Sequence, residues 1–352
     1  MINWLASMQQ TYEYFVVDPA TWKDLRQVHT VKDCTISRDS SESTLGSATM
    51  NTTEVLDECY IRVYLVAIQN GVKERVALGT FLVETPSVNF DGKAFSITMD
   101  AYTPLIELKH RKPPIGYAIL KGQSTMSVAS SLCRENLRAP VVPTTSSDTL
   151  QSDFVADIDE SWMSYISDLI SSAKYKFGLD EMGRILFKPD QDMRSLRSKW
   201  TYDDGNCSIL FPDISDKRDL FDIPNVVEVV YSKGVGYSFS RIVNDDPNSI
   251  VSTVNRGYEK VYRETNPRFT GVPTQSEIDA YAKQLLRELS CLEHTITYTH
   301  GYCPVTVDDC VTFNHKRAGL VNIKAKIVSQ SIKCSTGCQV QETAVYTTKL
   351  WG

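Results

Sequence analysis

The sequence predicts a mainly β protein of the α+β class, in which two β-rich modules flank a smaller mixed α/β module. Runs of alternating apolar residues recur from Val31 to about His110 and again after Pro212. Between them lies a segment with apolar residues at helical spacing. One strongly capped helix, at residues 275–290, is set among the later strands. We therefore assign residues 1–115 and 201–352 to the two β-rich modules and residues 116–200 to the connecting module.

The size and charge of the chain limit the classes of function. Its 352 residues exceed the length at which one hydrophobic core stops growing, so two or three domains are expected. The formal net charge of -6 argues against a protein that grips nucleic-acid phosphates, because such binding needs a positive field. We find neither a signal peptide nor an apolar run long enough to span a bilayer, so no membrane insertion is expected. Nine cysteines, an odd number spread along a long chain, are interpreted as free thiols.

The first module is predicted to be a strand meander that can close into a barrel. A strand carrying Ile61, Val63, Leu65 and Ala67 on one face leads to the hairpin turn Asn70-Gly71, and residues 76–83 return as its partner. Asp91-Gly92 marks a second turn, between strands at residues 87–90 and 94–99. The basic, proline-containing stretch 109–114 ends the pattern and is expected to be a solvated connector.

The connecting module is predicted to contain two helices and a small hairpin. The first helix covers residues 127–137. The second is capped by Asp159 or Ser161, and we expect Gly178 to end it. A turn at residues 180–183 then leads into a strand at residues 184–188. The buried stripe of the second helix is Met163, Ile166, Leu169, Ile170 and Ala173.

The second β-rich module contains the most distinct helix signal of the chain. Thr274 and Glu277 form a capping box. The apolar stripe that follows is Ile278, Tyr281, Ala282, Leu285, Leu286 and Leu289. The strand at residues 226–231 is apolar nearly throughout and is expected to be covered on both faces. Four or five strands should follow from Glu293 to Leu350, with turns at residues 318–319 and 336–337.

Few residues suggest chemistry. The only candidate metal cluster consists of His300, Cys303, Cys310 and His315, to which Cys334 and Cys338 could add donors. They lack a compact CxxC pair, and cysteine also serves as a small buried hydrophobe, so no metal site and no cofactor are predicted. Gly234-Val235-Gly236 lacks the third glycine and the helix of a dinucleotide site and is interpreted as a hairpin. The acidic stretches 203–206 and 244–248 are interpreted as turns, because their side chains bond the local backbone.

Six segments in order resemble the baseplate hub proteins of tailed bacteriophages, also called tail proteins of the late-control type. They are LGTFLVETP (78–86), KFGLDEMGRILFKP (176–189), NVVEVVYS (225–232), NDDPNSIVSTVNRG (244–257), TQSEIDAYAKQLLRELS (274–290) and the closing strands through Leu350-Trp351. The resemblance covers the chain from about Val31 to the C-terminus. Similar hubs occur in type VI secretion spikes.

This resemblance implies two tube-like β-barrel domains flanking the small mixed module. It also implies a homotrimeric ring that joins the sixfold tail tube to a threefold spike or tip, in a virion tail baseplate assembled in the host bacterial cytoplasm. The implied partners are tail tube or distal tail ring proteins, a spike or tip protein and a tape measure protein, with DNA only in transit. The expected interface residues are Tyr231, Asn244, Asp245, Asp246, Asn255 and Arg256.

The implied role is structural and not enzymatic. The chain ends at Gly352, soon after the last expected strand, so no lytic module is expected. A negative net charge would suit a channel wall past which DNA slides, since attraction to phosphate would hold it back. Two alternatives stay open: a metal-dependent hydrolase built on the four candidate ligands, and a carbohydrate- or receptor-binding tail-tip module that exposes Trp4, Trp22 or Trp200.

Overall fold

The computed structural model describes residues 2–90, 92–93, 95–191, 193–232, 237–265, 267 and 273–351. They divide into two compact units. Unit 1 extends to Asp213 and includes Tyr298–Thr343, whereas unit 2 includes Ile214–Thr297 and the residues from Ala344 on. Three strands continue from one unit into the other, namely β13 (Leu210–Asp219), β17 (Cys291–Gly301) and β20 (Gln339–Lys349).

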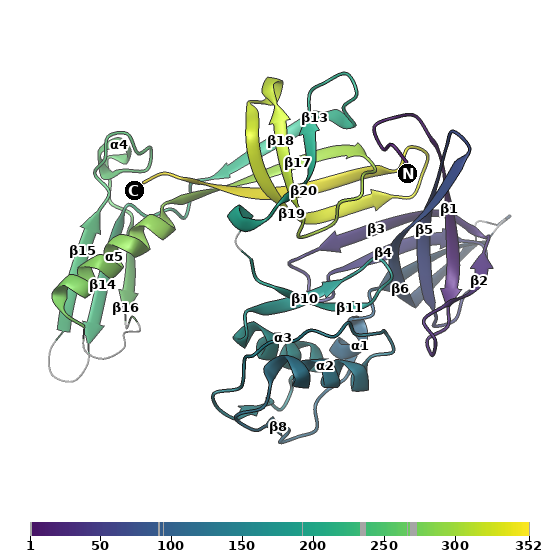
Figure 1. Cartoon of the computed structure of the whole chain (residues 1–352), viewed down its shortest axis with the longest axis horizontal. Coiled ribbons are helices and arrows are strands. Elements are labelled where there is room, and N and C mark those ends of the chain that lie inside the picture. Colours follow the sequence, from purple (N-terminus) through teal and green to yellow (C-terminus); the bar gives the residue numbers. More distant parts are fainter. Residues whose placement is uncertain are drawn as a thin grey trace. The chain divides into compact units, whose positions relative to one another are not determined.

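Unit 1 is built on an extensive β-sheet (Figure 1). Its other large-sheet strands are β1 (Gln9–Val17), β2 (Asp24–Val28), β3 (Val31–Asp39), β4 (Gly46–Thr52), β5 (Tyr60–Gln69), β6 (Val72–Phe90), β7 (Phe95–Tyr102), β12 (Ser198–Asp203), β18 (Cys310–His315) and β19 (Leu320–Lys333). Antiparallel pairs run from β18 through β19, β3, β4, β7, β6, β5 and β1 to β2, and β12 lies parallel to β18. The strand order ends at β2 on one side and β13 on the other. A mainly β fold is therefore confirmed, but the described strands do not form two closed barrels.

The hairpin of β5 and β6 forms where the sequence predicts it. Asn70 and Gly71 have φ values of 50° and 79°, the left-handed conformation that a two-residue hairpin turn needs. The predicted apolar face of β5 is buried, and so is its opposite face. Arg62 lies on that second face, where its guanidinium donates to the carbonyl oxygen of Met182. The strand is thus covered on both sides because the connecting module packs over it. In the next hairpin, the predicted strands are confirmed, while Asp91 and Ala94 of the predicted turn region lie outside the described residues.

The connecting module has both predicted helices. Its elements are α1 (Ile106–His110), β8 (Ala118–Ile119), α2 (Thr125–Asn136), β9 (Phe154–Val155), α3 (Trp162–Ser172), β10 (Tyr175–Leu179), β11 (Ile185–Pro189) and the short 3-10 turn Met193–Ser195. The Ser161 hydroxyl caps α3 by accepting from the amide of Ser164. The prediction that Gly178 ends this helix is wrong, because α3 stops at Ser172 and Lys174 adopts the left-handed conformation, with φ 60°. Gly178 instead lies inside β10, where the side chain of Lys188 packs against it.

Two apolar clusters of described residues contribute to the core of unit 1. One joins the connecting module to the N-terminal strands, since Trp22 and Tyr60 pack in the same cluster as Met126 and Ile166. The other fills the sheet and includes residues from both chain halves, such as Ile36 and Ile332. The N-terminal strands and the connecting module thus share a continuous core. The three-part division at residues 115 and 200 stays a prediction.

Unit 2 contains a three-stranded sheet with one helix across it (Figure 1). Its elements are β14 (Val226–Ser232), β15 (Tyr237–Val243), α4 (Thr253–Arg256), β16 (Val261–Thr265) and α5 (Gln275–Leu289). The capping box of Thr274 and Glu277 is confirmed, and the predicted stripe of α5 packs on Val227 and Val229 of β14. The opposite face of β14 carries Glu228, which binds Arg241 and Arg263. The apolar cover predicted on both faces is therefore present on one face, with an ion-paired cluster on the other.

The last four predicted strands are confirmed as β17 to β20. Their turns contain Gly319 and Gly337, whose φ values of 74° and 87° favour glycine, and the 3-10 turn Lys316–Ala318 precedes the first of them. Among the described residues, none of the helices combines the length and apolar character that crossing a bilayer requires.

Candidate functional site

The four candidate metal ligands do not form one group. His300 is fully buried in β17, and the Cys303 sulfur lies 3.8 Å from its Nδ1. Cys310 is buried at the start of β18, while His315 ends that strand and accepts from the amide of Ala318. Within the described part of the chain, no three His, Cys, Asp or Glu side chains converge in a way that could hold a metal ion. The sequence pattern thus located a true neighbour pair, His300 and Cys303, but not a tetrahedral site.

His300 instead belongs to a buried polar cluster made by strands that are far apart in the sequence. Its members are Tyr202 (β12), Tyr298 and His300 (β17), Cys303, Gln330 (β19) and Glu342 (β20). The His300 Nε2 lies 3.2 Å from Oε2 of Glu342 and 3.1 Å from the Tyr202 hydroxyl. The other carboxylate oxygen of Glu342 accepts from Nε2 of Gln330 at 2.6 Å. Neither His300 nor Glu342 is exposed, so the cluster holds four strands together and cannot reach a substrate.

The charges in this cluster stabilise one another. Burial lowers the pKa of His300, but the interactions with Cys303 and Glu342 outweigh it and raise the pKa to about 10. Burial acts in the opposite direction on Glu342, whose pKa is nevertheless lowered, chiefly by the hydrogen bond with His300. The arrangement is therefore an imidazolium–carboxylate ion pair without access to water. Removing one partner of such a pair strongly destabilises the protein, because the other charge stays buried and unpaired.

We expect the ion pair to make stability fall as the pH rises above neutrality. A histidine whose folded pKa is raised contributes stability that is complete below its ordinary pKa of about 6.5 and is lost as the pH approaches the folded value. Glu342, with its lowered pKa, contributes above its ordinary pKa and loses that contribution only in acid. Urea unfolding of the wild type and of His300→Gln measures this, as the difference between their unfolding free energies. That difference should shrink between about pH 6.5 and about pH 10; a constant difference would contradict the ion pair.

The polar cluster continues to a small cavity in unit 1. Gln330 accepts from the guanidinium of Arg38 at 2.7 Å, and Arg38 also donates to the hydroxyl of Thr306 and the carbonyl oxygen of Leu78. Arg38, Leu78 and Thr306 line a cavity of about 60 Å³. This volume suits about two water molecules, whereas pockets for small ligands usually exceed about 300 Å³. We therefore interpret the cavity as part of the packing between the sheet and the connecting module.

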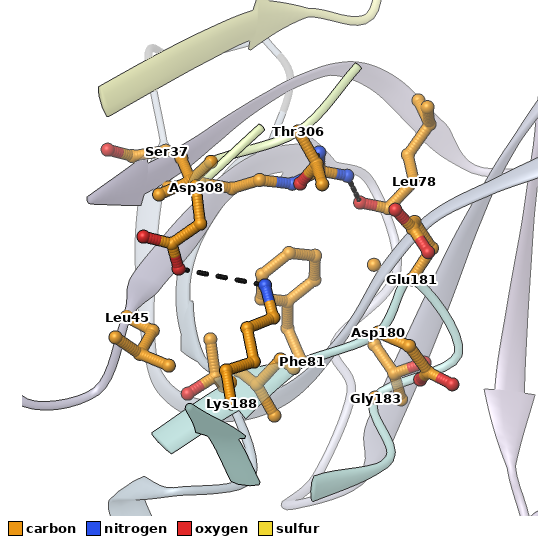
Figure 2. A pocket seen from close by; sticks show the side chains of 17 residues that line it. Ser37, Leu45, Leu78, Phe81, Asp180, Glu181, Gly183, Lys188, Thr306 and Asp308 are labelled. Carbon is orange, nitrogen blue, oxygen red and sulfur yellow. Dashed lines mark hydrogen bonds and ion pairs between the residues drawn. The ribbon is translucent and has the colours of Figure 1, made fainter. Parts of the chain in front are cut away.

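The rim of the cavity carries a charge cluster. Figure 2 shows the Lys188 ammonium directed into the cavity and joined to Asp308. The Asp308 carboxylate also binds Lys176 and Lys326, so three ammonium groups from β10, β11 and β19 share one acid. Burial raises the pKa of Asp308, yet the hydrogen bond with Lys176 and the other lysines keep it below its usual range. Asp308 thus fixes the β10–β11 hairpin to the C-terminal strands by charge.

The β10–β11 hairpin also requires glycine at position 183. Gly183 has a φ of 75°, and a Cβ there would lie 2.7 Å from the Cβ of Thr80. The turn therefore approaches β6 more closely than any side chain would allow. Glycine at this predicted turn has a packing role as well as a conformational one.

Five of the six expected interface residues lie in one loop of unit 2, and Tyr231 lies near the far end of β14. Asp245 is exposed and Asp246 is partly buried. Asn244 is fully buried, and its side-chain amide donates to the hydroxyl of Ser249. The amide of Asn255 donates to the carbonyl oxygens of Pro247 and Ser249. Asn244 and Asn255 thus fix the shape of the loop.

The other two expected residues also make contacts within unit 2. The Arg256 guanidinium donates to the carbonyl oxygens of Leu220 and Ile223. Tyr231 packs partly buried against the core beneath α5. Of the six expected residues, Asp245 and Asn255 are the most exposed to solvent. The remaining four therefore support the loop and its strand more than they extend its surface.

Sequence reasoning missed the apolar residues of the same loop. Ile250, Val254 and Tyr258 are exposed by 56%, 60% and 59%, although a solvated loop would favour polar side chains there. It also missed Glu342. A signal existed for that residue, because Val340, Glu342 and Ala344 follow one another on the buried face of β20. An acid at an inward position of an alternating strand calls for a buried partner.

Comparison with known proteins places this fold among phage tail proteins. No family model and no curated protein sequence matches the chain. In structure, the chain resembles the tail protein from Neisseria meningitidis, with 12% identity, a TM-score of 0.63 and coverage of 97% of this chain and 98% of that one. It also resembles the prophage MuSo2 43 kDa tail protein from Shewanella oneidensis, with 10% identity, a TM-score of 0.65 and coverage of 96% and 98%. A chain of the Francisella PdpA–VgrG complex matches with 9% identity, a TM-score of 0.57 and coverage of 98% and 53%. The protein therefore has the fold of phage tail proteins, which is shared with a chain of a VgrG complex.

Proposed function

We propose that this protein is the structural hub of a phage tail baseplate, a homotrimeric ring that adapts the sixfold tail tube to a threefold spike or tip. The observation that carries this proposal is the match of nearly the whole chain to two tail proteins, one of them from a prophage. The match to a chain of a PdpA–VgrG complex, over 53% of that chain, extends the same fold to a second kind of assembly. A hub explains both similarities, because it contacts the tube on one side and the tip on the other.

The proposed partners follow from this position. They are tail tube or distal tail ring proteins, a spike or tip protein and a tape measure protein, all within the virion tail. DNA would pass through the ring without being held, which agrees with the net charge of -6. The role is non-enzymatic. The buried polar cluster supports this view, since its histidine and acid are closed to solvent.

A ring also accounts for the strand edges of unit 1. Among the described strands, β2 pairs with β1 and has no second partner. An unpaired edge is a site of aggregation unless it is covered. Placing subunits side by side around a threefold axis would cover such edges in a closed assembly.

We place a subunit contact on the loop of residues 244–258 in unit 2. Its exposed polar residues, Asp245 and Asn255, lie in the same short loop and helix as Ile250, Val254 and Tyr258. Exposed apolar residues beside polar ones are typical of protein contact sites. The internal hydrogen bonds of Asn244 and Asn255 hold this loop in one shape, which lowers the entropy cost of binding.

The experiment compares assembly and stability in one variant. Replacing both Ile250 and Val254 by Asp should dissociate the assembly, measured by sedimentation velocity, because two charges would be buried at the contact. The melting temperature of the subunit should change little, since both positions are exposed. Val321→Asp, at a 50% exposed position of β19, is the control that should keep the wild-type sedimentation. Loss of assembly in the control, or none in the double variant, would overturn this placement of the contact.

A further inference from the structure

Cys34 and Cys334 are far apart in the sequence but lie opposite each other where β3 and β19 pair. The β3–β19 ladder pairs Ser37 with Ser331, Ile36 with Ile332 and Thr35 with Lys333. The next pair in this register is Cys34 with Cys334. The amide of Cys334 donates to the carbonyl oxygen of Cys34 at 2.9 Å, so the pair is a directly opposed, hydrogen-bonded one. Such pairs have Cα atoms about 5.5 Å apart, within the usual range for a disulfide of about 4.4 to 6.8 Å.

The two side chains lie in the same apolar core. Cys34 is 2% exposed and Cys334 is 5% exposed, and both pack in the cluster that contains Ile36 and Ile332. A hydrogen bond with the Cys34 thiol, together with burial, raises the pKa of Cys334 well above its ordinary value. Both are free thiols in this structure. The backbone register therefore places two free thiols at directly opposed positions.

The position of the pair gives an oxidant a route to it. β19 ends at Lys333, and a turn begins directly after Cys334. Cys334 thus lies at the end of the ladder, where opening breaks fewer hydrogen bonds than opening at the centre. Cys338, at the far side of the turn, is the nearest competing thiol and is fully buried.

We propose that Cys34 and Cys334 are an oxidation site that forms a disulfide by exchange with a low-molecular-weight disulfide such as glutathione disulfide. The thiolate of one cysteine attacks the oxidant, which releases one glutathione thiol and leaves a mixed disulfide on the protein. The second thiolate then attacks that mixed disulfide and releases the second glutathione. Two protein thiols are oxidised to one disulfide, and one glutathione disulfide is reduced to two thiols.

The new bond would tie the third strand of the chain to its penultimate one. This link closes a loop that contains most of the chain, which restricts the unfolded chain and raises the melting temperature. Cytosolic thiols are kept reduced, whereas oxidising surroundings form disulfides. A chain that leaves the cytosol would therefore acquire the link after assembly, a consequence that rests on the proposed function.

The test uses the full-length protein and glutathione disulfide at about pH 8.5, the ordinary pKa of a thiol that local opening brings into water. After the remaining thiols are alkylated, digestion without reduction and mass spectrometry should identify a linked pair of peptides containing Cys34 and Cys334. The melting temperature should rise by roughly 5 °C and return to its starting value after dithiothreitol. Cys34→Ser should lose both the link and the rise, whereas Cys338→Ser should keep both.

Two other results of the glutathione experiment would contradict the proposed disulfide. Glutathione adducts without the Cys34–Cys334 link at equilibrium, or a Cys334–Cys338 link in its place, would overturn the proposal. Because the readout on the wild-type chain is a covalent bond, a variant that fails to fold leaves the test intact. Failure of the link would not affect the hub assignment, which depends on assembly.

Discussion

Replacing Glu342 by Gln is expected to lower the free energy of unfolding by about 3 to 5 kcal/mol. The change keeps the shape of the side chain but removes the charge that balances the His300 imidazolium. It also exchanges one of the two carboxylate acceptors for a donor. Either the Tyr298 hydroxyl or the Gln330 amide, which donate to different carboxylate oxygens, then loses its acceptor. Urea unfolding followed by tryptophan fluorescence and circular dichroism measures the loss.

The matched control is Glu293→Gln, the same chemical change at an exposed position of β17. It should alter the unfolding free energy by less than about 0.5 kcal/mol. Equal effects at the two positions would mean that the buried carboxylate does not stabilise His300. In that case the ion pair would not be an element that joins the four strands.

Replacing Arg62 by Met should cost about 3 kcal/mol of stability, because a buried charge with several partners is lost. Arg62 is 1% exposed, and its guanidinium donates to Asp24 at 2.8 Å, to the Thr80 hydroxyl at 2.9 Å and to the carbonyl oxygen of Met182 at 3.2 Å. Methionine fills the space of the stem and leaves those acceptors unpaired. We place the value at the lower end of the range because Asp24 is 22% exposed and partly screened.

Arg26→Met is the control for Arg62. Arg26 also forms an ion pair, with Glu54 at 2.9 Å, but its side chain is 51% exposed. Its loss should cost between zero and about 1 kcal/mol, the range of surface ion pairs. Hydrogen exchange gives a second readout, since Arg62→Met should loosen the β10–β11 turn that contains Met182. A variant that unfolds like the wild type, with unchanged protection of that turn, would show that Arg62 does not hold the module to the sheet.

The features predicted from the sequence are those that neighbouring residues determine. The β5–β6 hairpin depends on Asn70 and Gly71, whose left-handed backbone is a local requirement. The α5 helix begins at Thr274 because its capping partner Glu277 is three residues away. Local signals can also mislead. Gly178 suggests a helix stop, but α3 ends at Ser172, Lys174 adopts the left-handed conformation, and Gly178 allows close packing inside a strand.

The features that the sequence did not predict depend on contacts between distant segments. The chemistry of His300 makes it a candidate metal ligand in the sequence, but its partner in the structure is Glu342, from another strand. The burial of both faces of β5 depends on Met182, from the connecting module. Strand alternation identifies one inward face and cannot show what covers the other. The same limit applies to barrel closure, which depends on how distant strands pair.

The mass of the purified protein in solution tests the central claim most directly. Light scattering over a range of concentrations, followed by electron-microscope class averages of the same sample, gives both the subunit number and the shape. The account predicts a particle of three chains with threefold symmetry and a central hole. A compact monomer that persists at the highest concentration would contradict the self-assembling trimeric ring.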